Sequence, residues 1–207
     1  MIGPLQLKHV PWAVAQHAAL MQQSVFAMFG PRFLELWYRA FAISPHAVAF
    51  VDEQDGHPRA VIASTSNRPA FLRELLRRSG FALAWCSARA VLRNGACRRL
   101  VGRLPGYLAR SGRGDVTAEM IFITVAPAVR GHGIAQQLIR RTLQEFRRRG
   151  VDKVHVSIES GKHGVRAMLH SFGFVVIDRF AFADKPHELL ALDLTRRAVL
   201  PDNPAPA

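Results

Sequence analysis

Arg130-Gly131-His132-Gly133-Ile134-Ala135 is the stretch that decides the fold of this 207-residue chain. A run rich in β-forming residues, 119–125, precedes it, and an amphipathic run, 136–149, follows it. The stretch therefore lies at a predicted turn from a strand into a helix. Glycines in such a turn let backbone N–H groups converge, and the first helical turn adds free N–H groups and the positive end of the helix dipole. Together these features predict a binding site for a diphosphate.

The same stretch resembles the acyl-CoA signature of the GNAT acetyltransferase superfamily, whose core is Arg/Gln-x-x-Gly-x-Gly/Ala. The resemblance continues through a predicted strand, 153–160, to Phe172-Gly173-Phe174, which is similar to the closing Gly-Phe of that family. The matching block, 119–174, covers about a quarter of the chain. It implies an α/β (α+β) fold: a mixed, mostly antiparallel sheet with one splayed parallel strand pair, flanked by helices.

The other segments fit a single domain over 1–197 with a disordered tail at 198–207. Periodicity and turn residues predict the remaining elements in an order that also fits the resemblance. The predicted strands are 5–8, 47–52, 59–65, 174–182 and 188–194, and the predicted helices are 10–29 and 32–42.

A basic helical insertion is predicted at about 67–116, with helices over 69–78, 81–93 and 98–110. Between Arg68 and Arg113 the chain has eleven arginines, no lysine and one acidic residue, Glu74, so this segment carries +10 of the net charge of +13. Charge asymmetry of this size indicates an anionic partner.

Three partners suit the basic segment 68–113, and a solvated surface remains the fourth interpretation. The first is an anionic acceptor such as a nucleotide-linked or lipid-linked sugar amine. The second is an anionic membrane, with Phe81, Leu83, Trp85 and Leu92 at the lipid interface. The third is nucleic acid, which the absence of any recognised nucleic-acid motif disfavours.

The N-terminal part adds a weaker resemblance. Residues 26–39 resemble GNAT-like proteins associated with exopolysaccharide or capsule assembly, which favours a sugar or lipid-linked amine as acceptor. Phe33, Trp37 and Tyr38 belong to the helix that walls the acceptor pocket in that fold, although most of them are expected in the core.

Composition argues against a membrane-spanning or secreted protein. No apolar stretch approaches the roughly 18–20 residues that a spanning helix needs, and the N-terminus lacks the features of a signal peptide. A cytoplasmic protein, with contact at the inner face of the membrane as a further option, is the expectation. Cys86 and Cys97 are expected to be reduced thiols, and no Cys/His cluster has metal-ligand spacing.

The resemblance implies acetyl-CoA, or another acyl-CoA, as co-substrate in the gap between the two splayed strands. The backbone N–H groups of Arg130 to Ala135 would hold the diphosphate, and the thioester would lie near Thr124 and Val125. His163 and Arg166, near the start of the next helix, are further candidates for the cofactor site. The predicted activity is transfer of an acetyl group to an amine by direct attack.

Two catalytic residues are predicted. Glu119 is the candidate general base, in a position that resembles the base glutamate of several family members, and the N–H of Val125 is the candidate oxyanion donor. Simple alternation would place Glu119 and Val125 on one face of their strand. Glu119 could instead be a strand-start carboxylate that pairs with an arginine. Glu159, His155 and Asp115 are alternative bases.

One position departs from the family pattern. Leu169 stands where the family often has a tyrosine that protonates the leaving thiolate, and His163 stands at a frequent asparagine. His163, His170 or Ser171 could supply the proton, although His170 fits a surface histidine better. The departure keeps open a second function: a non-catalytic module that binds CoA without turnover.

Overall fold

The computed structural model describes residues 1–22, 24–95, 97–99, 101, 116–182 and 185–195. Its strands form one sheet in the order β1-β2-β3-β4-β5-β7-β6. The strands are β1 (Ile2–Pro4), β2 (Ala47–Gln54), β3 (His57–Thr65), β4 (Ala118–Val125), β5 (Lys153–Glu159), β6 (Val175–Phe182) and β7 (Lys185–Asp193). The α-helices are α1 (Val10–Leu20), α2 (Val25–Met28), α3 (Pro31–Ile43), α4 (Arg68–Arg93), α6 (Ile134–Arg148) and α7 (His163–Ser171), and the short 3-10 helices are η1 (Leu7–His9) and η2 (Pro127–Val129).

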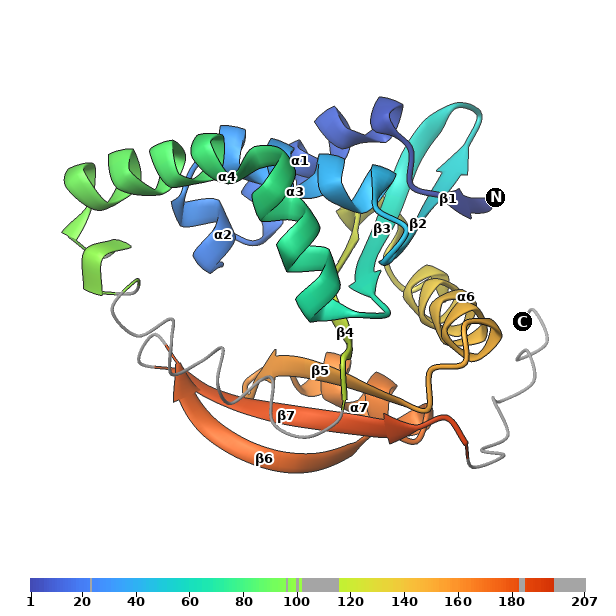
Figure 1. Cartoon of the computed structure of the whole chain (residues 1–207). Helices are drawn as coiled ribbons and strands as arrows, with labels where there is room; N and C mark the ends of the chain where they lie inside the picture. The colour runs from blue at the N-terminus through green and yellow to red at the C-terminus, as the bar shows by residue number, and fades with distance from the viewer. Residues whose placement is uncertain (23, 96, 100, 102–115, 183–184, 196–207) are drawn as a thin grey trace.

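The sheet divides at β4 and β5. These two strands are parallel, whereas the other neighbouring strands pair antiparallel. Register partners between β4 and β5 run from Ala118 and Val154 to Met120 and Val156. Beyond that point the strands separate, and Figure 1 shows β1–β3 and β5–β7 as two blades that diverge on either side of β4. The predicted fold class, with its splayed parallel pair, is confirmed.

The two faces of the sheet carry separate hydrophobic cores. On one face, α6 and α7 bury their apolar sides against strand residues such as Ile62, Met120 and Val156. On the other face, α1, α3 and α4 pack against residues that include Val61, Ala63 and Phe122. The apolar spacing of the run after the Gly turn explains α6, since Leu138, Ile139, Leu143 and Phe146 are all fully buried there.

A β-bulge in β4 changes which side chains face which core. Ala63 pairs with Phe122 but Ser64 pairs with Met120, so Ile121 is an extra residue in the ladder. Met120, before the bulge, and Ile123 and Val125, after it, all pack on the α6–α7 side. Glu119 therefore faces the α1–α4 side, together with Thr124. The predicted alternation, which placed Glu119 and Val125 on one face, is wrong because it assumed a regular strand.

Several predicted boundaries also differ from the structure. The first strand is Ile2–Pro4, and Leu7–His9 forms a 3-10 helix instead of continuing it. The predicted helix over 10–29 is divided into α1 and α2. The two predicted helices 69–78 and 81–93 are one helix, α4, which changes direction part-way along (Figure 1). A Ser-Gly pair at 79–80 lies near its middle, and such pairs are common sites of helix kinks.

The described part of the basic segment 68–113 packs onto the main core through α4. Phe71, Leu75 and Leu83 are buried with the residues of α3. Leu83 therefore cannot reach a lipid interface, which corrects the prediction for this residue. Most of the predicted helix over 98–110 and the predicted tail at 198–207 lie outside the described residues. Within the described ranges, no helix has both the length and the apolar content to span a bilayer.

Candidate functional site

The Gly turn joins β4 to α6 and exposes backbone donors. Gly131 and Gly133 have φ values of +83° and +72°, which L side chains adopt only with strain. Gly133 is the N-cap of α6 and has no side-chain cap, so the first N–H groups of the helix lack intrahelical partners. Gln137 is the first residue after the turn, in the described structure, whose N–H bonds a backbone carbonyl, that of Gly133. The turn can therefore donate several hydrogen bonds to an anion.

Two of the predicted cofactor residues shape this turn with their side chains. Nε of Arg130 donates to the carbonyl oxygen of Val125 at 3.3 Å, so the guanidinium braces the turn against the end of β4. Nδ1 of His132 donates to the carbonyl oxygen of Arg130 at 3.0 Å. Both side chains hold the shape of the loop. The N–H of Arg130 bonds the carbonyl of Pro127 at 3.3 Å, so the donors that remain for an anion begin after it.

The edge of β4 that faces the gap carries two backbone donors. The N–H of Ala126 bonds the carbonyl of Arg59 at the β3 edge, and N–H directions alternate along a strand. The N–H groups of Ile123 and Val125 therefore point toward β5, beyond the last register pair between the two strands. The predicted donor Val125 thus faces the gap. Ile123, a second donor, was missed because its direction depends on the strand pairing.

Polar side chains line the α1–α4 side of the same gap. Thr124 lies on β4, and His155 and Ser157 lie on β5, each alternating with residues of the α6–α7 core. Oγ1 of Thr124, Nδ1 of His155 and Oγ of Ser157 are buried without a hydrogen-bond partner. Burial lowers the pKa of His155, so its imidazole is neutral at physiological pH. Buried polar atoms without partners are costly, and their concentration at this gap indicates a ligand site.

Glu119 lies at the closed end of the gap, in register with His155. Its side chain is 11% exposed and forms an ion pair with Nε of Arg68, the first residue of α4, at 3.2 Å. Burial raises the pKa of Glu119, whereas the charge of Arg68 lowers it, and burial is the larger effect. Glu119 is thus both the arginine-paired carboxylate considered from the sequence and a carboxylate with the raised pKa that suits a general base.

A buried polar cluster on α1–α3 lies behind this wall. His17 bonds the hydroxyl of Tyr38 at 3.1 Å and Oγ of Ser24 at 2.7 Å, and its ring contacts Phe122 of β4 edge-on. Burial lowers the pKa of His17 to about 4 and raises the pKa of Tyr38. The expectation that Phe33, Trp37 and Tyr38 are core residues is confirmed. Sequence reasoning missed His17 because it lies 21 residues from its partner Tyr38.

The predicted residues of α7 have mixed positions. His163 is exposed at the start of the helix, whereas Nε of Arg166 is 3.3 Å from the buried carboxylate of Glu188. Leu169 is 1% exposed and belongs to the α6–α7 core, so it has no acid role. The exposed His170 bonds the carbonyl of Phe174 at 2.9 Å, as expected of a structural surface histidine.

The alternative bases are separated. Glu159, at the open end of β5, forms an ion pair with Lys185 at 3.2 Å. His155 lies beside Glu119, and Asp115 lies outside the described residues. Cys97 is buried and Cys86 is partly buried, and both are free thiols. Among the residues that the structure describes, no group of three or more His, Cys, Asp or Glu could hold a metal ion.

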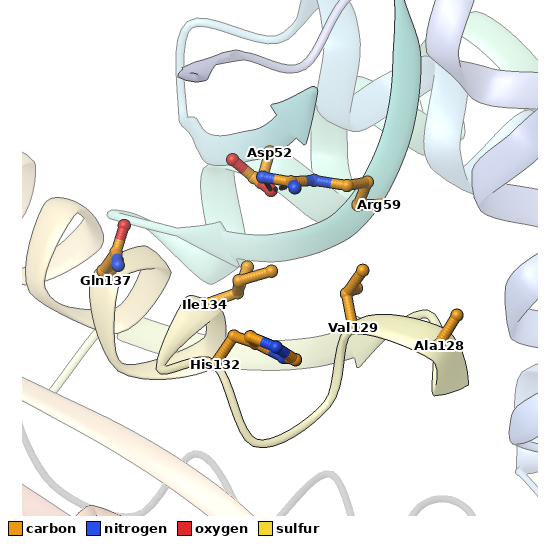
Figure 2. A pocket seen from close by; sticks show the side chains of 7 residues that line it. All are labelled: Asp52, Arg59, Ala128, Val129, His132, Ile134 and Gln137. Atoms are coloured by element: carbon orange, nitrogen blue, oxygen red, sulfur yellow. Dashed lines mark hydrogen bonds and ion pairs between the residues drawn. The ribbon is translucent and has the colours of Figure 1, made fainter. Parts of the chain in front are cut away.

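A pocket of about 310 Å³ lies beside the Gly turn, between the β2–β3 hairpin and the start of α6 (Figure 2). Arg59 and Asp52 form one wall, with their side chains in an ion pair at 2.7 Å. His132 and Ile134 point into the pocket from the turn and α6. Because its lining includes neither Thr124 nor any β5 residue, this pocket is distinct from the gap between β4 and β5.

Comparison with known proteins agrees with this architecture. The sequence model of the Acetyltransferase (GNAT) family matches residues 18–174. An N-acetyltransferase from Staphylococcus aureus Mu50 is similar in structure, with a TM-score of 0.60, 15% identity and coverage of 94% of this chain and 98% of that chain. The ribosomal-protein-alanine N-acetyltransferase of Brucella melitensis has a TM-score of 0.60 and 15% identity, with coverage of 93% of this chain and 99% of that chain. A candidate acetyltransferase from Salmonella typhimurium, solved with its cofactor acetyl-CoA, has a TM-score of 0.59 and 16% identity, with coverage of 100% of this chain and 97% of that chain.

A comparison with curated protein sequences finds no match. At these identities the similar structures establish the fold alone, whereas the family match spans more than half of the chain. Together with the Gly turn and the splayed parallel strands, it shows that the chain belongs to the GNAT acetyltransferase family.

Proposed function

We propose that this protein is an acyl-CoA-dependent N-acyltransferase that moves an acetyl group from acetyl-CoA to an amine. One observation carries the proposal: the parallel strands β4 and β5 separate after Met120 and Val156, and the strand that leaves the pair leads directly into the Gly turn. The acyl arm of the cofactor fits such a gap between strand ends, and its diphosphate fits the N–H groups of the turn.

In this proposal the N–H groups of Gly131, His132, Gly133, Ile134 and Ala135 bind the diphosphate. Arg130, whose own N–H bonds the carbonyl of Pro127, supports the turn with its side chain. Thr124 and Val125 border the acyl arm, while His163 and Arg166 face the cofactor from α7. Arg166 is already tied to Glu188, so its charge would act from a fixed position rather than by a new contact. Acetyl-CoA is bound by the similar Salmonella typhimurium protein, which supports this choice of co-substrate.

The acceptor amine attacks the thioester carbon after Glu119 takes its proton. A buried carboxylate with a raised pKa is a stronger base, and this shift brings it closer to the operating pH. The N–H of Val125, or that of Ile123, stabilises the oxyanion. Ile123 is the closer of the two to Glu119, at about 13 Å along the strand compared with about 20 Å for Val125. These lengths imply that water or His155 relays the proton to Glu119.

The thiolate of CoA leaves without a tyrosine at position 169. A thiol with a pKa near ~8.5 is an acceptable leaving group without an acid, so the buried Leu169 does not prevent turnover. The acceptor is proposed to be a small amine, an amino sugar or a lipid-linked amine. The resemblance of the N-terminal part to exopolysaccharide-assembly proteins stays a prediction.

The alternative function is a module that binds CoA without turnover. Two observations favour it: Leu169 offers no acid, and the ion pair with Arg68 ties up the carboxylate of Glu119. The two functions agree on the cofactor site and differ in turnover. An enzyme releases CoA from acetyl-CoA when an acceptor amine is present, whereas the module does not release it with any amine.

The first experiment measures thermal stability with and without acetyl-CoA. A ligand at ~100 times its dissociation constant stabilises by about 2.7 kcal/mol, which raises the melting temperature of a chain of this size by roughly 5–10 °C. Gly131→Ala should weaken acetyl-CoA binding by about tenfold, because the new side chain strains the turn at a positive φ. A CoA-release assay with a panel of amines then separates the enzyme from the module.

Gly150→Ala is the matched control. Gly150 also has a positive φ, +70°, and an added Cβ meets nothing within 4 Å at either glycine. Both variants should lose about 1 kcal/mol of stability, but Gly150→Ala should keep full affinity for acetyl-CoA. If wild type shows no shift with acetyl-CoA or longer acyl-CoAs, or if both variants bind equally, the proposed cofactor site is wrong.

A further inference from the structure

The outer half of α4 exposes large apolar side chains. Phe81, Trp85 and Leu92 are 88%, 65% and 87% exposed. With the exposed Ala88 they follow the spacing i, i+4, i+7 and i+11, which places them along one side of a helix. We call these four residues, Phe81, Trp85, Ala88 and Leu92, the α4 stripe. Contiguous exposed apolar surface of this kind marks an interaction site.

Arginines border the α4 stripe. Arg77, Arg78, Arg89 and Arg93 are all exposed. At 100° per residue Arg89 and Arg93 project along one side of the apolar line, and Arg77 and Arg78 lie just before the bend at its start. In all, α4 carries six arginines and one acidic residue, Glu74, which is paired with Arg78 at 2.9 Å. The surface is therefore an apolar line with positive charge along one side and at its start.

The α4 stripe is part of a folded helix and not of an uncovered core. On the side of this outer half away from the stripe, Leu83 is buried and Cys86 and Ala90 are partly buried against the core that contains α3, while Phe71 and Leu75 fix the inner half of α4. Figure 1 shows the outer half of α4 extending past α2 and α3, away from the sheet. The fold thus holds the stripe in a fixed, outward position.

Charge decides between the partners that could cover the α4 stripe. A second copy of this chain would bring two arginine-rich edges together, which like-charge repulsion disfavours. Nucleic acid would satisfy the arginines but would leave the phenylalanine, tryptophan and leucine without a partner. An anionic lipid surface satisfies both, since headgroup phosphates meet the arginines and the acyl boundary accepts the apolar residues.

We propose that the α4 stripe and its bordering arginines dock the protein on an anionic membrane surface. The outer half of α4 lies in the plane of the interface, with Phe81, Trp85 and Leu92 inserted between lipids and Arg89 and Arg93 at the level of the phosphates. This docking is peripheral and reversible. It is independent of the proposed acyl transfer, because no residue of the cofactor site takes part in it.

The test is co-sedimentation of the full-length protein with vesicles of phosphatidylcholine alone or mixed with phosphatidylglycerol. Binding is expected to the anionic vesicles only and to weaken as NaCl is raised. Emission from the tryptophans should shift to shorter wavelength on binding, because Trp85 leaves water. Phe81→Ser combined with Trp85→Ser should lower the partition coefficient at least tenfold and abolish that shift.

Charge variants test the second component of the surface. Arg89→Gln combined with Arg93→Gln should weaken vesicle binding by about 25-fold, since each cation near the surface is worth roughly fivefold. The matched controls are Val175→Ser with Ile177→Ser, which removes exposed apolar residues from β6, and Arg141→Gln with Lys153→Gln, which removes two exposed charges elsewhere. Both controls should bind vesicles like wild type, and all variants should stay folded; loss of the Arg141 contact over the Phe50 ring should cost at most ~1 kcal/mol.

Three outcomes would overturn the proposal. The first is the absence of binding to anionic vesicles at low salt. The second is binding that the stripe variants and their controls change equally, which would assign it to overall charge. The third is an α4 stripe buried in a concentration-dependent dimer, or in a complex with duplex or single-stranded nucleic acid, with no vesicle binding.

Discussion

The two faces of β4 and β5 differ in what they bury. Toward α6 and α7 these strands present Ala118, Met120, Val154, Val156 and Ile158, all apolar and all packed. Toward α1–α4 the same strands present the buried Phe122 and also the polar residues Glu119, Thr124, His155 and Ser157. Three of these four polar residues have a buried polar atom without a partner. A face built for stability alone satisfies or avoids such atoms. The difference indicates that the α6–α7 face of these two strands serves the fold alone, whereas their α1–α4 face combines a packed core with polar groups suited to a ligand.

Two buried glutamates give the sharpest test of this contrast. Glu119→Gln should lower kcat by about 10²-fold or more, because the amide cannot accept the proton of the acceptor amine. Glu145, on α6, is the matched residue: it is also buried and also bound to arginine, Arg148 and Arg149. Glu145→Gln should lower stability but leave kcat within twofold. Equal kcat losses in the two variants, measured by CoA release, would remove the functional distinction between the faces.

The same two glutamates should contribute to the stability of the folded protein in opposite pH ranges. Burial raises the pKa of Glu119 above 4.5, so the folded state holds this proton more tightly than the unfolded chain does. Its contribution to stability is complete below about pH 4.5 and is lost as pH rises through the folded-state pKa. Hydrogen bonds from Arg148 lower the pKa of Glu145 to about 2, so its contribution is present above pH 4.5 and is lost as pH falls toward 2.

Urea unfolding between pH 2 and pH 8 measures both effects. Glu145→Gln should flatten the stability curve between about pH 4.5 and pH 2, by on the order of 1–2 kcal/mol after allowance for solvent screening. Glu119→Gln should reduce the change in the free energy of unfolding above pH 4.5 and leave its change below pH 4.5 as in wild type. A Glu119→Gln curve parallel to wild type above pH 4.5 would contradict the raised pKa.

Two threonines give the smallest expected effect. Oγ1 of Thr124 is buried without a partner, whereas Oγ1 of Thr142 on α6 donates to the carbonyl of Leu138 at 2.9 Å. Thr124→Val should therefore be neutral or stabilise by up to ~1 kcal/mol, and Thr142→Val should destabilise by about 1 kcal/mol. If Thr124 contacts a ligand, its valine variant also loses activity while it gains stability. A destabilised Thr124→Val protein would mean that Oγ1 has a structural partner after all.

The strongly local parts of this fold were predictable from sequence. The Gly turn, α6 and the hairpin of β2 and β3 each follow from residues that are close in the chain, so their signals lie within one short window. The positions of Gly131 and Gly133 could be assigned a role before the structure because a positive φ and a helix start are local properties.

The parts that depend on pairing between distant segments were not predictable. The bulge at Ile121 is a property of the pairing between β3 and β4, and no residue type in 119–125 predicts it. The alternation along 119–125 therefore placed Glu119 on the wrong face of the strand. Which apolar residues of 67–93 face the core could not be decided from sequence, because this depends on how α4 packs on α3; the membrane interpretation therefore placed Leu83 at the lipid interface, whereas it is buried. The cluster of His17, Ser24 and Tyr38 joins three helical segments and has no spacing signal.

The short seam between β4 and β5 also divides the chain into units of assembly. Strands β1–β4 pair antiparallel with one another, and so do strands β5–β7. Each of these two groups of strands is therefore held together by its own hydrogen-bonded pairing. The seam closes by register pairs from Ala118 to Met120 only, and apart from the edge pairing of β1 with β2, which is equally short, the other pairings in the sheet are longer. Local opening at such a seam costs less than global unfolding, and it comes late in folding because its partners are distant in sequence. A ligand held between the two strands would therefore join two cooperative units into one.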